Sequence, residues 1–378
     1  MRGAKVFWGA LAAGLAMVAG CAAPEAEVPR GPVAQVRAGP SAGGAAEVSP
    51  SAPITAEVVR GRFDLVTLMG SDGSAVTGQI APDGRSWQAT EPLAYDTSYT
   101  WSGQAIGSDG KLVPVGGAFS TVAPKRTTGA TVSPTDGQQV GIAMPISVKF
   151  DEPVQDKAAV QRALSVETSV PVEGAWAWLA DDEAHWRPRE YWPAGTQVQV
   201  HARLFGAHFG GGVYGEGDLR TEFEIGRAQI VKADVDSHQL VVERDGEQVA
   251  SYPASYGLAS DPGRHTGNGT YVVMARVPLQ LMTNPKYGYF DLPKKWAVRI
   301  SNHGEFIHEN QANAAALGSY NNSHGCINLS AANAKEYYDS ALIGDPVEVT
   351  GSGTDMEPGY AMYDWLLSWE EWTAKSAV

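Results

Sequence analysis

The residues best suited to chemistry lie in the stretch SHGCIN, residues 323–328. One of the two cysteines of the chain, Cys326, stands two positions after His324 and downstream of His308. A thiolate attacks a carbonyl carbon well and leaves well, so it can form an acyl-enzyme and pass the acyl group on. A free thiol titrates near pH ~8.5, so a neighbouring imidazole is needed to draw off its proton. This pattern predicts a nucleophile for acyl transfer, the alternative being a buried and inert thiol.

The other cysteine, Cys21, ends an export signal. A positively charged start precedes an apolar run over residues 6–18, which is too short for a membrane-spanning helix. Residues 18–21 read VAGC and resemble the lipobox of bacterial lipoproteins, whose cysteine receives a lipid; an ordinary signal peptide is the alternative. We expect residues 1–21 to be a lipoprotein signal, with Cys21 anchoring the exported chain to the outer face of the cell membrane, facing the cell wall. Cys326 then has no partner for an intramolecular disulfide.

Composition narrows the class of protein. Of the 378 residues, 43% are hydrophobic and 19% are charged, and the chain contains 43 Gly and 23 Pro. These values predict a globular, turn-rich protein of about two or three domains. The formal net charge of -14 argues against a nucleic-acid partner.

The N-terminal half reads as β-structure behind a tether. Residues 22–50 lack aromatic side chains and are rich in Ala, Pro and Gly, so we expect a flexible linker. Downstream, short alternating runs separated by turn sequences such as SDGS and APDG indicate β-strands. Trp87 and Trp186 are each followed by a Thr and a further alternating run, which indicates a repeat. We predict two sandwiches, residues 51–124 and 125–226, of immunoglobulin-like size, and PISVKFDEPV in the second resembles bacterial Ig-like repeats.

Four tryptophans of the second sandwich permit two interpretations. Aromatic faces can stack on sugars, which would make Trp176, Trp178, Trp186 and Trp192 a carbohydrate platform. No polar cluster accompanies them, however, and Trp176 and Trp178 share one face of a strand. We therefore expect these side chains to fill the sandwich core.

Residues 227–350 form a third β-rich segment that carries the candidate nucleophile. Within it, residues 278–296 are rich in Pro, aromatics and Lys, and a loop of this length in a compact domain is usually functional, so we predict a lid. After Cys326, the sequence SAANAKEYYDSAL predicts a helix with Ser330 as its N-cap. We therefore expect Cys326 to lie just before a helix start, where the helix dipole favours a thiolate.

The segment that contains His308 and SHGCIN resembles the catalytic domain of the L,D-transpeptidases, also called the YkuD fold, which crosslink bacterial peptidoglycan. The family pattern is a histidine, a loop, and then Ser/Thr-His-Gly-Cys followed by an apolar residue and Asn or Arg. Two Ig-like modules before it are the arrangement of actinobacterial members. The resemblance implies a mainly β fold, with two tandem immunoglobulin-like sandwiches followed by a β-rich YkuD-type domain with a short helix after the cysteine and a C-terminal helical tail. It also implies that Cys326 is the nucleophile and His308 the general base, while His324 and Gly325 shape the thiolate pocket.

The same resemblance assigns the rest of the site. The backbone amides of Gly325 and Cys326 would donate to the oxyanion, and Ser323 belongs to the same pocket. Glu309 departs from the family pattern, in which many members have Ser or Gly after the base, and this bears on acceptor preference. Substrate contacts, including a lid aromatic, are expected from residues at the rim: Asn328, His303, Gly304, and Tyr289 or Phe290.

The resemblance implies the formation of 3→3 crosslinks. Cys326 would attack the L-centre carbonyl of diaminopimelate in a donor tetrapeptide, release D-Ala, and pass the acyl group to the side-chain amine of another stem. Carbapenems are expected to acylate the same thiol, and no cofactor is expected. The alternatives are an L,D-carboxypeptidase of the same fold and a non-catalytic spacer that binds the cell wall. No metal is expected, because His303 and His308 differ by an odd number along a strand and should face opposite sides, so that they would not complete a zinc site with His324 and Cys326.

The last segment, residues 351–378, is expected to pack back on the folded domains. Trp365, Trp369 and Trp372 recur at helical spacing, so a helix would place all three on one face. A membrane-surface helix is the alternative, but such a helix would be rich in Lys and Arg, whereas this segment is acidic. We therefore expect the aromatic face to dock in the groove between the second sandwich and the catalytic domain.

Overall fold

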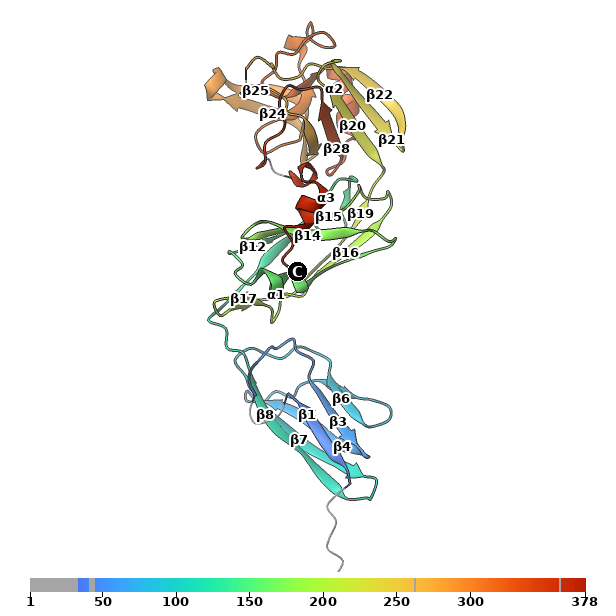
Figure 1. The fold of residues 1–378 in the computed structure, drawn as a ribbon, viewed down its shortest axis with the longest axis vertical. Helices are drawn as coiled ribbons and strands as arrows, with labels where there is room; N and C mark the ends of the chain where they lie inside the picture. The colour runs from blue at the N-terminus through green and yellow to red at the C-terminus, as the bar shows by residue number, and fades with distance from the viewer. Residues whose placement is uncertain (1–32, 41–44, 262, 360–361) are drawn as a thin grey trace, which may run out of the picture.

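The structure, a computed structural model, places three β-rich units in a row along the long axis of the molecule (Figure 1). The expected export signal and Cys21 lie outside the described part of the chain. Within that part, no helix is both long enough and apolar enough to cross a membrane. The described residues are 33–40, 45–261, 263–359 and 362–378.

The first unit is a sandwich of two four-stranded sheets with a common apolar core. One sheet has the order β1-β3-β6-β5, with bounds Gln35–Gly39, Thr55–Val59, Ser86–Ala89 and Gly78–Ile80. The other has the order β2-β8-β7-β4, with bounds Ala45–Val48, Leu112–Thr121, Ser98–Gly107 and Gly61–Gly70.

The predicted linker over residues 22–50 is too long, because β1 and β2 lie inside it. β1 is paired antiparallel with β3, and the side chains of Ala34 and Ala38 are buried. Small apolar residues are enough for a strand whose backbone groups find partners, so the lack of aromatic residues did not exclude one.

The second unit is also a sandwich, and its core contains the four tryptophans. Their side chains are 2% to 8% exposed, which confirms the prediction of a core over a sugar platform. The sheets have the orders β10-β12-β15-β14, β11-β19-β16-β13 and β17-β18-β9. In chain order, β9 to β12 span Arg126–Thr128, Ala130–Ser133, Gln139–Val140 and Ile146–Phe150, and α1 spans Lys157–Arg162. The remaining strands, β13 to β19, span Leu164–Thr168, Gly174–Ala180, Glu183–Pro188, Gln197–Ala202, His208–Gly210, Val213–Gly215 and Leu219–Ile225.

The predicted repeat has a structural counterpart in both sandwiches. Trp87 and Trp186 are buried in their respective cores. Each indole ring covers a glycine of the neighbouring strand, Gly78 or Gly174, where an added Cβ would fall 2.0 Å from the ring. The two modules therefore use the same arrangement, in which an absent side chain lets a tryptophan lie flat against the backbone.

The third unit contains two sheets and a helix, and the candidate site lies on the four-stranded sheet and its loops. A five-stranded sheet has the order β22-β21-β20-β28-β23, and a four-stranded sheet has the order β24-β25-β26-β27. Helix α2, Ala331–Ser340, begins at Ser330, whose hydroxyl caps the Asn333 amide as predicted. Strands β20 to β23 span Gln229–Asp234, Gln239–Arg244, Glu247–Pro253 and Gly269–Val272. Strands β24 to β28 span Ala275–Asn284, Tyr289–Arg299, Phe306–Glu309, Ile327–Leu329 and Pro346–Thr350.

The predicted lid loop over residues 278–296 is instead a long β-hairpin formed by β24 and β25. The two strands are joined by a short 3-10 turn, Pro285–Tyr287, and by Gly288 in the left-handed region at φ 69°. The hairpin projects from the side of the catalytic unit (Figure 1). Its sequence has runs of like residues, such as Tyr289-Phe290 and Lys294-Lys295, in place of a strict polar and apolar alternation, and it contains prolines, so the strands were not recognised.

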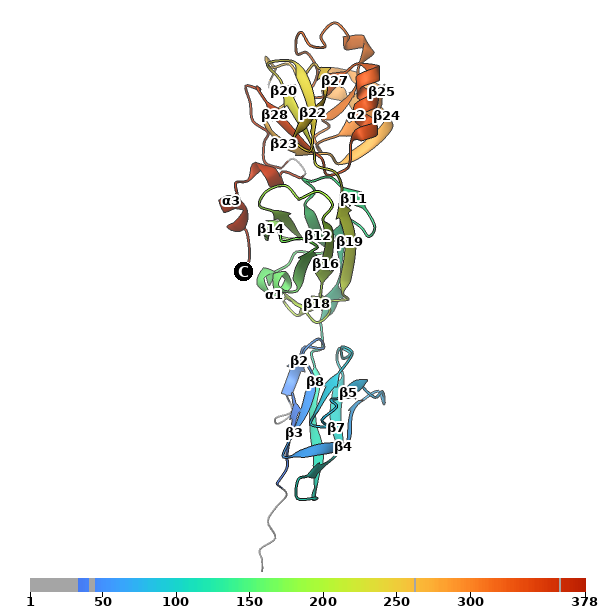
Figure 2. The ribbon, with the colours of Figure 1, turned by 90° about the vertical axis from the view of Figure 1, so that its right-hand side faces the viewer.

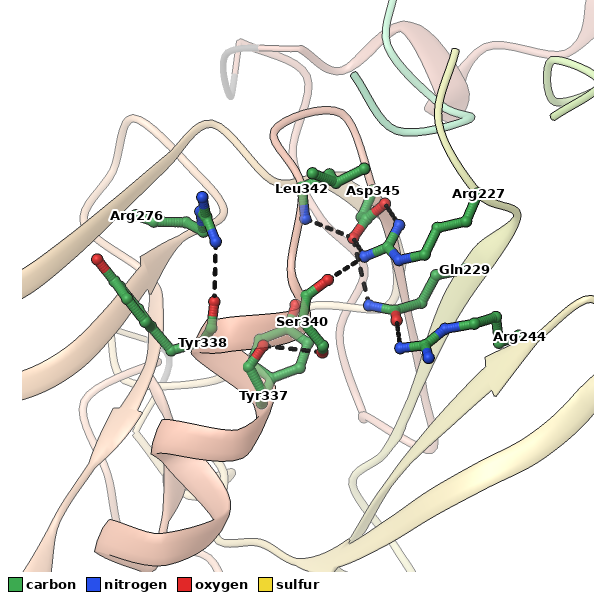
Figure 3. Close-up of polar contacts among 9 residues, drawn as sticks. All are labelled: Arg227, Gln229, Arg244, Arg276, Tyr337, Tyr338, Ser340, Leu342 and Asp345. Atoms are coloured by element: carbon green, nitrogen blue, oxygen red, sulfur yellow. Dashed lines mark hydrogen bonds and ion pairs between the residues drawn. The ribbon is translucent and has the colours of Figure 1, made fainter. Parts of the chain in front are cut away.

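A polar contact centred on Asp345, whose side chain is fully buried, lies within the third unit where it meets the second (Figure 3). Arg227 donates to both of its carboxylate oxygens, at 2.8 and 2.7 Å, and the Leu342 amide donates to one of them at 2.8 Å. The adjacent loop accepts backbone hydrogen bonds from Gly141 and Ala143 of the second sandwich. These bonds hold the catalytic unit at the end of that sandwich.

The tail packs against the second sandwich where docking was predicted (Figure 2). It is not one helix, because a 3-10 turn, Asp364–Leu366, and helix α3, Trp369–Thr373, are separated by extended Leu367 and by Ser368. Ser368 forms a capping box with Glu371, so a new helix begins there.

The tail is held by a cluster that we call the clasp: Asp364, Trp365, Trp369 and Trp372 of the tail with Glu183, His185 and Arg187 of β15. The Arg187 guanidinium lies 4.6, 5.5 and 4.8 Å from the centroids of the three indole rings. Trp365 donates to the Ala143 carbonyl at 2.8 Å. Leu366 and Tyr363 also pack on the core of the catalytic unit, so the tail contacts both units.

Candidate active site

Two parallel neighbouring strands bring the predicted nucleophile and base into one cavity. β26 and β27 are paired in parallel, and the register sets His308 beside Asn328. Cys326 immediately precedes β27 and lies two residues before Asn328, so alternation puts its side chain on the same face as that of Asn328. Cys326 and His308 both line a cavity of about 630 Å³, which is walled on one side by the β24/β25 hairpin.

The turn before the nucleophile is held by Ser323. Its hydroxyl donates to the Cys326 carbonyl at 2.6 Å and accepts from the Gly325 amide at 3.2 Å. Gly325 has φ 107°, a backbone conformation that residues with a Cβ rarely adopt. Because its amide already has a partner, Gly325 does not serve as an oxyanion donor here, contrary to the prediction, and Ser323 shapes the turn.

The surroundings of the partly buried Cys326 thiol favour its neutral form. Burial raises its pKa to about 12, although a hydrogen bond from the Phe306 amide acts in the opposite direction. The sulfur atom lies 3.5 Å from the carbonyl oxygen of Gly304. The predicted position just before a helix start is wrong, because β27 separates Cys326 from Ser330, the N-cap of α2. A base is therefore needed to generate the thiolate.

His308 has the geometry of such a base. Its side chain is 4% exposed, and its Nδ1 lies 2.7 Å from the carbonyl oxygen of Glu309. A carbonyl only accepts hydrogen bonds, so the proton of the neutral imidazole resides on Nδ1 and Nε2 is the proton acceptor. Burial lowers the pKa of His308 to about 4, and the positive charge of Lys294 acts in the same direction.

His324 lies under the tip of the hairpin. Its ring centroid is 4.6 Å from that of Tyr287 and 5.4 Å from that of Tyr289. Partial burial and the charge of Arg264 lower its pKa. His324 and Tyr289 line the cavity, whereas the Phe290 side chain is 62% exposed and does not line it. Of the two aromatic residues proposed for the lid, the structure therefore favours Tyr289.

The remaining predicted substrate residues divide into two groups. His303 and Gly304 are exposed and line the cavity, as expected for a rim. Asn328 also borders the cavity, but it is 1% exposed and its side-chain amide donates to the carbonyls of Ser255 and Cys326, each at 3.3 Å. Asn328 therefore positions the nucleophile rather than presenting free donors to a peptide.

Two residues of the site were missed by the sequence analysis. Lys294 on β25 and Asn310 after β26 both line the cavity and are joined by a hydrogen bond of 2.8 Å. Strand alternation would have placed Lys294 on the same face as Leu292, had the hairpin been recognised, whereas Tyr289 reaches the cavity only because the register shifts between Met282 and Asn284. No local pattern marks Asn310.

The alternative of a zinc site finds no support in the described part of the chain, where no group of three or more His, Cys, Asp or Glu side chains gathers as metal ligands would. His308 is buried in a strand, while His303 and His324 are exposed on separate loops.

Two family models and several relatives match this chain. The family model of the bacterial Ig domain matches residues 45–208, and that of the L,D-transpeptidase catalytic domain matches residues 228–349. L,D-transpeptidase 5 of Mycobacterium tuberculosis is 50% identical over 341 residues, which are 88% of this chain and 75% of the relative. L,D-transpeptidase 2 of the same species is 36% identical over 348 residues, with 88% and 83% covered.

A solved structure of the LD transpeptidase LdtMt1 in complex with imipenem shares the fold. It aligns with a TM-score of 0.51 and 34% identity, and the alignment covers 59% of this chain and 99% of that chain. Together with the two family models, this likeness confirms the predicted fold class, in which bacterial Ig-like sandwiches precede a YkuD-type domain.

Proposed function

Because the chain belongs to the L,D-transpeptidase family, we propose that it forms 3→3 crosslinks in peptidoglycan through an acyl-enzyme on Cys326. The observation that carries this proposal is a thiol and an imidazole in one cavity, with the imidazole Nδ1 bound to a backbone carbonyl, so that Nε2 is the proton acceptor. An imidazole held in this tautomer can accept a proton from the thiol and donate it to a leaving amine.

The reaction proceeds in two halves. His308 takes the proton of Cys326 as the sulfur attacks the L-centre carbonyl of diaminopimelate in a donor tetrapeptide. The tetrahedral intermediate expels the amine of the terminal D-Ala, which receives the proton from His308, and a thioester remains. The side-chain amine of an acceptor stem then attacks the thioester and loses its proton to His308. Cys326 leaves as a thiolate and is reprotonated, which restores the neutral pair.

The hairpin supports transfer to an amine over transfer to water. It walls the cavity beside Cys326 along Gln280, Met282 and Tyr289. A substrate that fills this cavity excludes bulk water from the thioester. A carboxypeptidase would instead release a free tripeptide acid, so the products distinguish the two activities.

Intact mass of the purified ectodomain tests the proposal. After incubation with a tetrapeptide stem, we expect a covalent adduct at the mass of the acyl tripeptide and an equimolar release of D-Ala. With a carbapenem, we expect a stable adduct, in keeping with the imipenem complex of LdtMt1. Cys326→Ala should abolish both adducts, and an adduct that persists in this variant would contradict the assignment. Addition of an acceptor stem should yield a crosslinked dimer; the tripeptide acid alone would indicate a carboxypeptidase.

We also propose that Cys21 carries a lipid that anchors the enzyme to the outer face of the cell membrane. The support is the VAGC sequence that ends the apolar signal. The full-length protein should partition into detergent, and Cys21→Ser should release an enzyme with unchanged acylation rate, because two sandwiches separate Cys21 from the catalytic unit along the chain. A wild-type protein that stays in the aqueous phase would refute the anchor.

A further inference from the structure

The side chain of Lys294 lies on the face of the hairpin that borders the cavity. The register of β24 and β25 sets Lys294 opposite Gln280, followed by the pairs Met282 with Leu292 and Asn284 with Tyr289. All six side chains line the cavity. Lys294 is partly buried and is the one charged member of this strip.

Lys294 differs from other lysines of the molecule in its partner. Lys149, Lys157, Lys232 and Lys335 each lie within 4 Å of a carboxylate. Among the described residues Lys294 forms no ion pair, and its Nζ donates to the amide oxygen of Asn310 at 2.8 Å. A neutral amide does not compensate a partly buried ammonium as a carboxylate would.

The position of Lys294 is coupled to the nucleophile by two amides. Asn310 Nδ2 donates to Asn328 Oδ1 at 2.7 Å, and Asn328 Nδ2 donates to the Cys326 carbonyl at 3.3 Å. These bonds fix the amide orientation of Asn310, so that its oxygen faces Lys294. The ammonium is therefore held in a defined place relative to the reacting sulfur.

The other permanent charges of the cavity lining are engaged within the protein. Arg299 donates to the carbonyls of Ser301 and Asn302, at 2.8 and 3.2 Å. Glu305 accepts from the Ser301 hydroxyl. Although the chain has a formal net charge of -14, its cavity thus offers a cation to an incoming ligand.

We propose that Lys294 is a specificity-determining residue that binds a carboxylate of the donor stem peptide. This inference rests on the proposed function, because it names the substrate group that the same site recognises. A donor tetrapeptide whose D-glutamate α-carboxylate is amidated offers this group at two places, the terminal D-Ala carboxylate and the side-chain carboxylate of diaminopimelate, and such amidated stems are used below. A charge-assisted hydrogen bond from Lys294 to either one would orient the scissile carbonyl toward Cys326.

Acylation kinetics of three variants on three stems test the inference. The variants are Lys294→Met, which keeps the length of the side chain, Lys294→Arg, which keeps its charge, and the control Lys295→Met, an exposed neighbour on the opposite face. The stems are the free tetrapeptide, one with a D-Ala carboxamide, and one with a diaminopimelate side-chain carboxamide.

On the free tetrapeptide, Lys294→Met should lower kcat/KM roughly 10- to 100-fold, mainly through KM, which is the range for a hydrogen bond to a charged group. Lys294→Arg should restore part of the loss, and Lys295→Met should match wild type. The loss should vanish on the carboxamide stem that lacks the recognised group, which identifies the carboxylate.

An equal loss on all three stems would overturn the inference and assign Lys294 to positioning through Asn310. No loss on any stem would also overturn it while leaving the proposed function intact. Failure of the wild-type protein to be acylated by every stem would refute the proposed function, and the inference with it.

Discussion

Two buried histidines of this molecule have pKa values that are shifted in opposite directions. His308 in the catalytic unit is 4% exposed, and His185 in the clasp is 6% exposed. Burial alone lowers the pKa of an imidazole, and it does so for His308, to about 4. His185 is buried as well, but Asp364 and Glu183, whose oxygens lie 2.7 and 3.0 Å from its ring nitrogens, outweigh that penalty and raise its pKa to about 9.

The hydrogen-bond partner of each histidine ring, rather than its depth of burial, decides the direction in which its pKa is shifted. His308 contacts a backbone carbonyl, which orients the ring without charging it. Glu309 is adjacent in sequence, but its carboxylate accepts from the backbone amides of Lys295 and Gln311. A carboxylate on the ring, as in the clasp, would have converted the base into a fixed cation.

The largest effect should follow from removing the base. His308→Ala should slow acylation of Cys326 by roughly two to four orders of magnitude, the usual contribution of a general base. His303→Ala, at the exposed rim, should have a smaller effect, and His185→Ala should leave the acylation rate of folded protein within a few-fold of wild type. Acylation rates measured by quenched flow and intact mass would show this order. A larger loss in His303→Ala than in His308→Ala would contradict the assignment of His308 as the base.

Deleting residues 360–378, which removes the tail part of the clasp, should lower the stability of the protein. The deletion removes Asp364 and the fully buried Trp372, and leaves His185 with Glu183 but without Asp364, and Arg187 without the indole rings that cover it. Breaking a buried ionic cluster typically costs several kcal/mol, so the melting temperature should fall by roughly 10 °C. Solution scattering should show a looser arrangement of the second and third units. Unchanged stability, with lost binding of the unlipidated ectodomain to liposomes, would make the tail a membrane contact.

The two histidines should also give stability opposite dependences on pH. His185 has a folded pKa of about 9 against an ordinary 6.5, so its contribution is complete below pH 6.5 and is lost as the pH rises through 9. His308 has a folded pKa of about 4, so stability is lost as the pH falls from 6.5 toward 4, where the unfolded chain binds a proton that the folded one excludes. Each change amounts to roughly 3 kcal/mol.

Urea titrations of His185→Ala and His308→Ala, each compared with wild type across this range, isolate the two contributions. The difference between wild type and His185→Ala should shrink above pH 7, and His308→Ala should lose less stability than wild type below pH 6. If the stability of each variant instead stays parallel to that of wild type across the pH range, folding shifts neither pKa and the comparison is contradicted.

The sequence predicted well what local patterns encode. SHGCIN and His308 pointed to two side chains that the structure brings into one cavity, the Ser330 cap located a helix start, and tryptophan spacing indicated both sandwich cores. Where the prediction was wrong, the pattern was misread: the strands of the hairpin were hidden by prolines and by runs of like residues, and β1 was obscured by small residues. The prediction that Cys326 lies directly before a helix start was wrong, because the three residues of β27 separate it from the N-cap of α2.

Other features were not accessible from sequence because they depend on distant pairings. His185 and Asp364 are 179 residues apart in the chain, and Arg227 and Asp345 are 118 apart. Lys294 and Asn310 meet only because the hairpin folds over the loop that follows His308. No local period marks such pairs, since each is created by packing of separate elements.

The central claim is that His308 is a neutral base with its proton on Nδ1. Nitrogen-15 NMR of the histidine rings, assigned with His308→Ala and His185→Ala, measures this directly. Between pH 5 and 8, roughly the range left by the two shifted pKa values, we expect His308 to show one protonated and one unprotonated nitrogen, with Nε2 unprotonated. Over the same range His185 should show both nitrogens protonated. A doubly protonated His308 at neutral pH would reveal a thiolate–imidazolium pair and contradict the account.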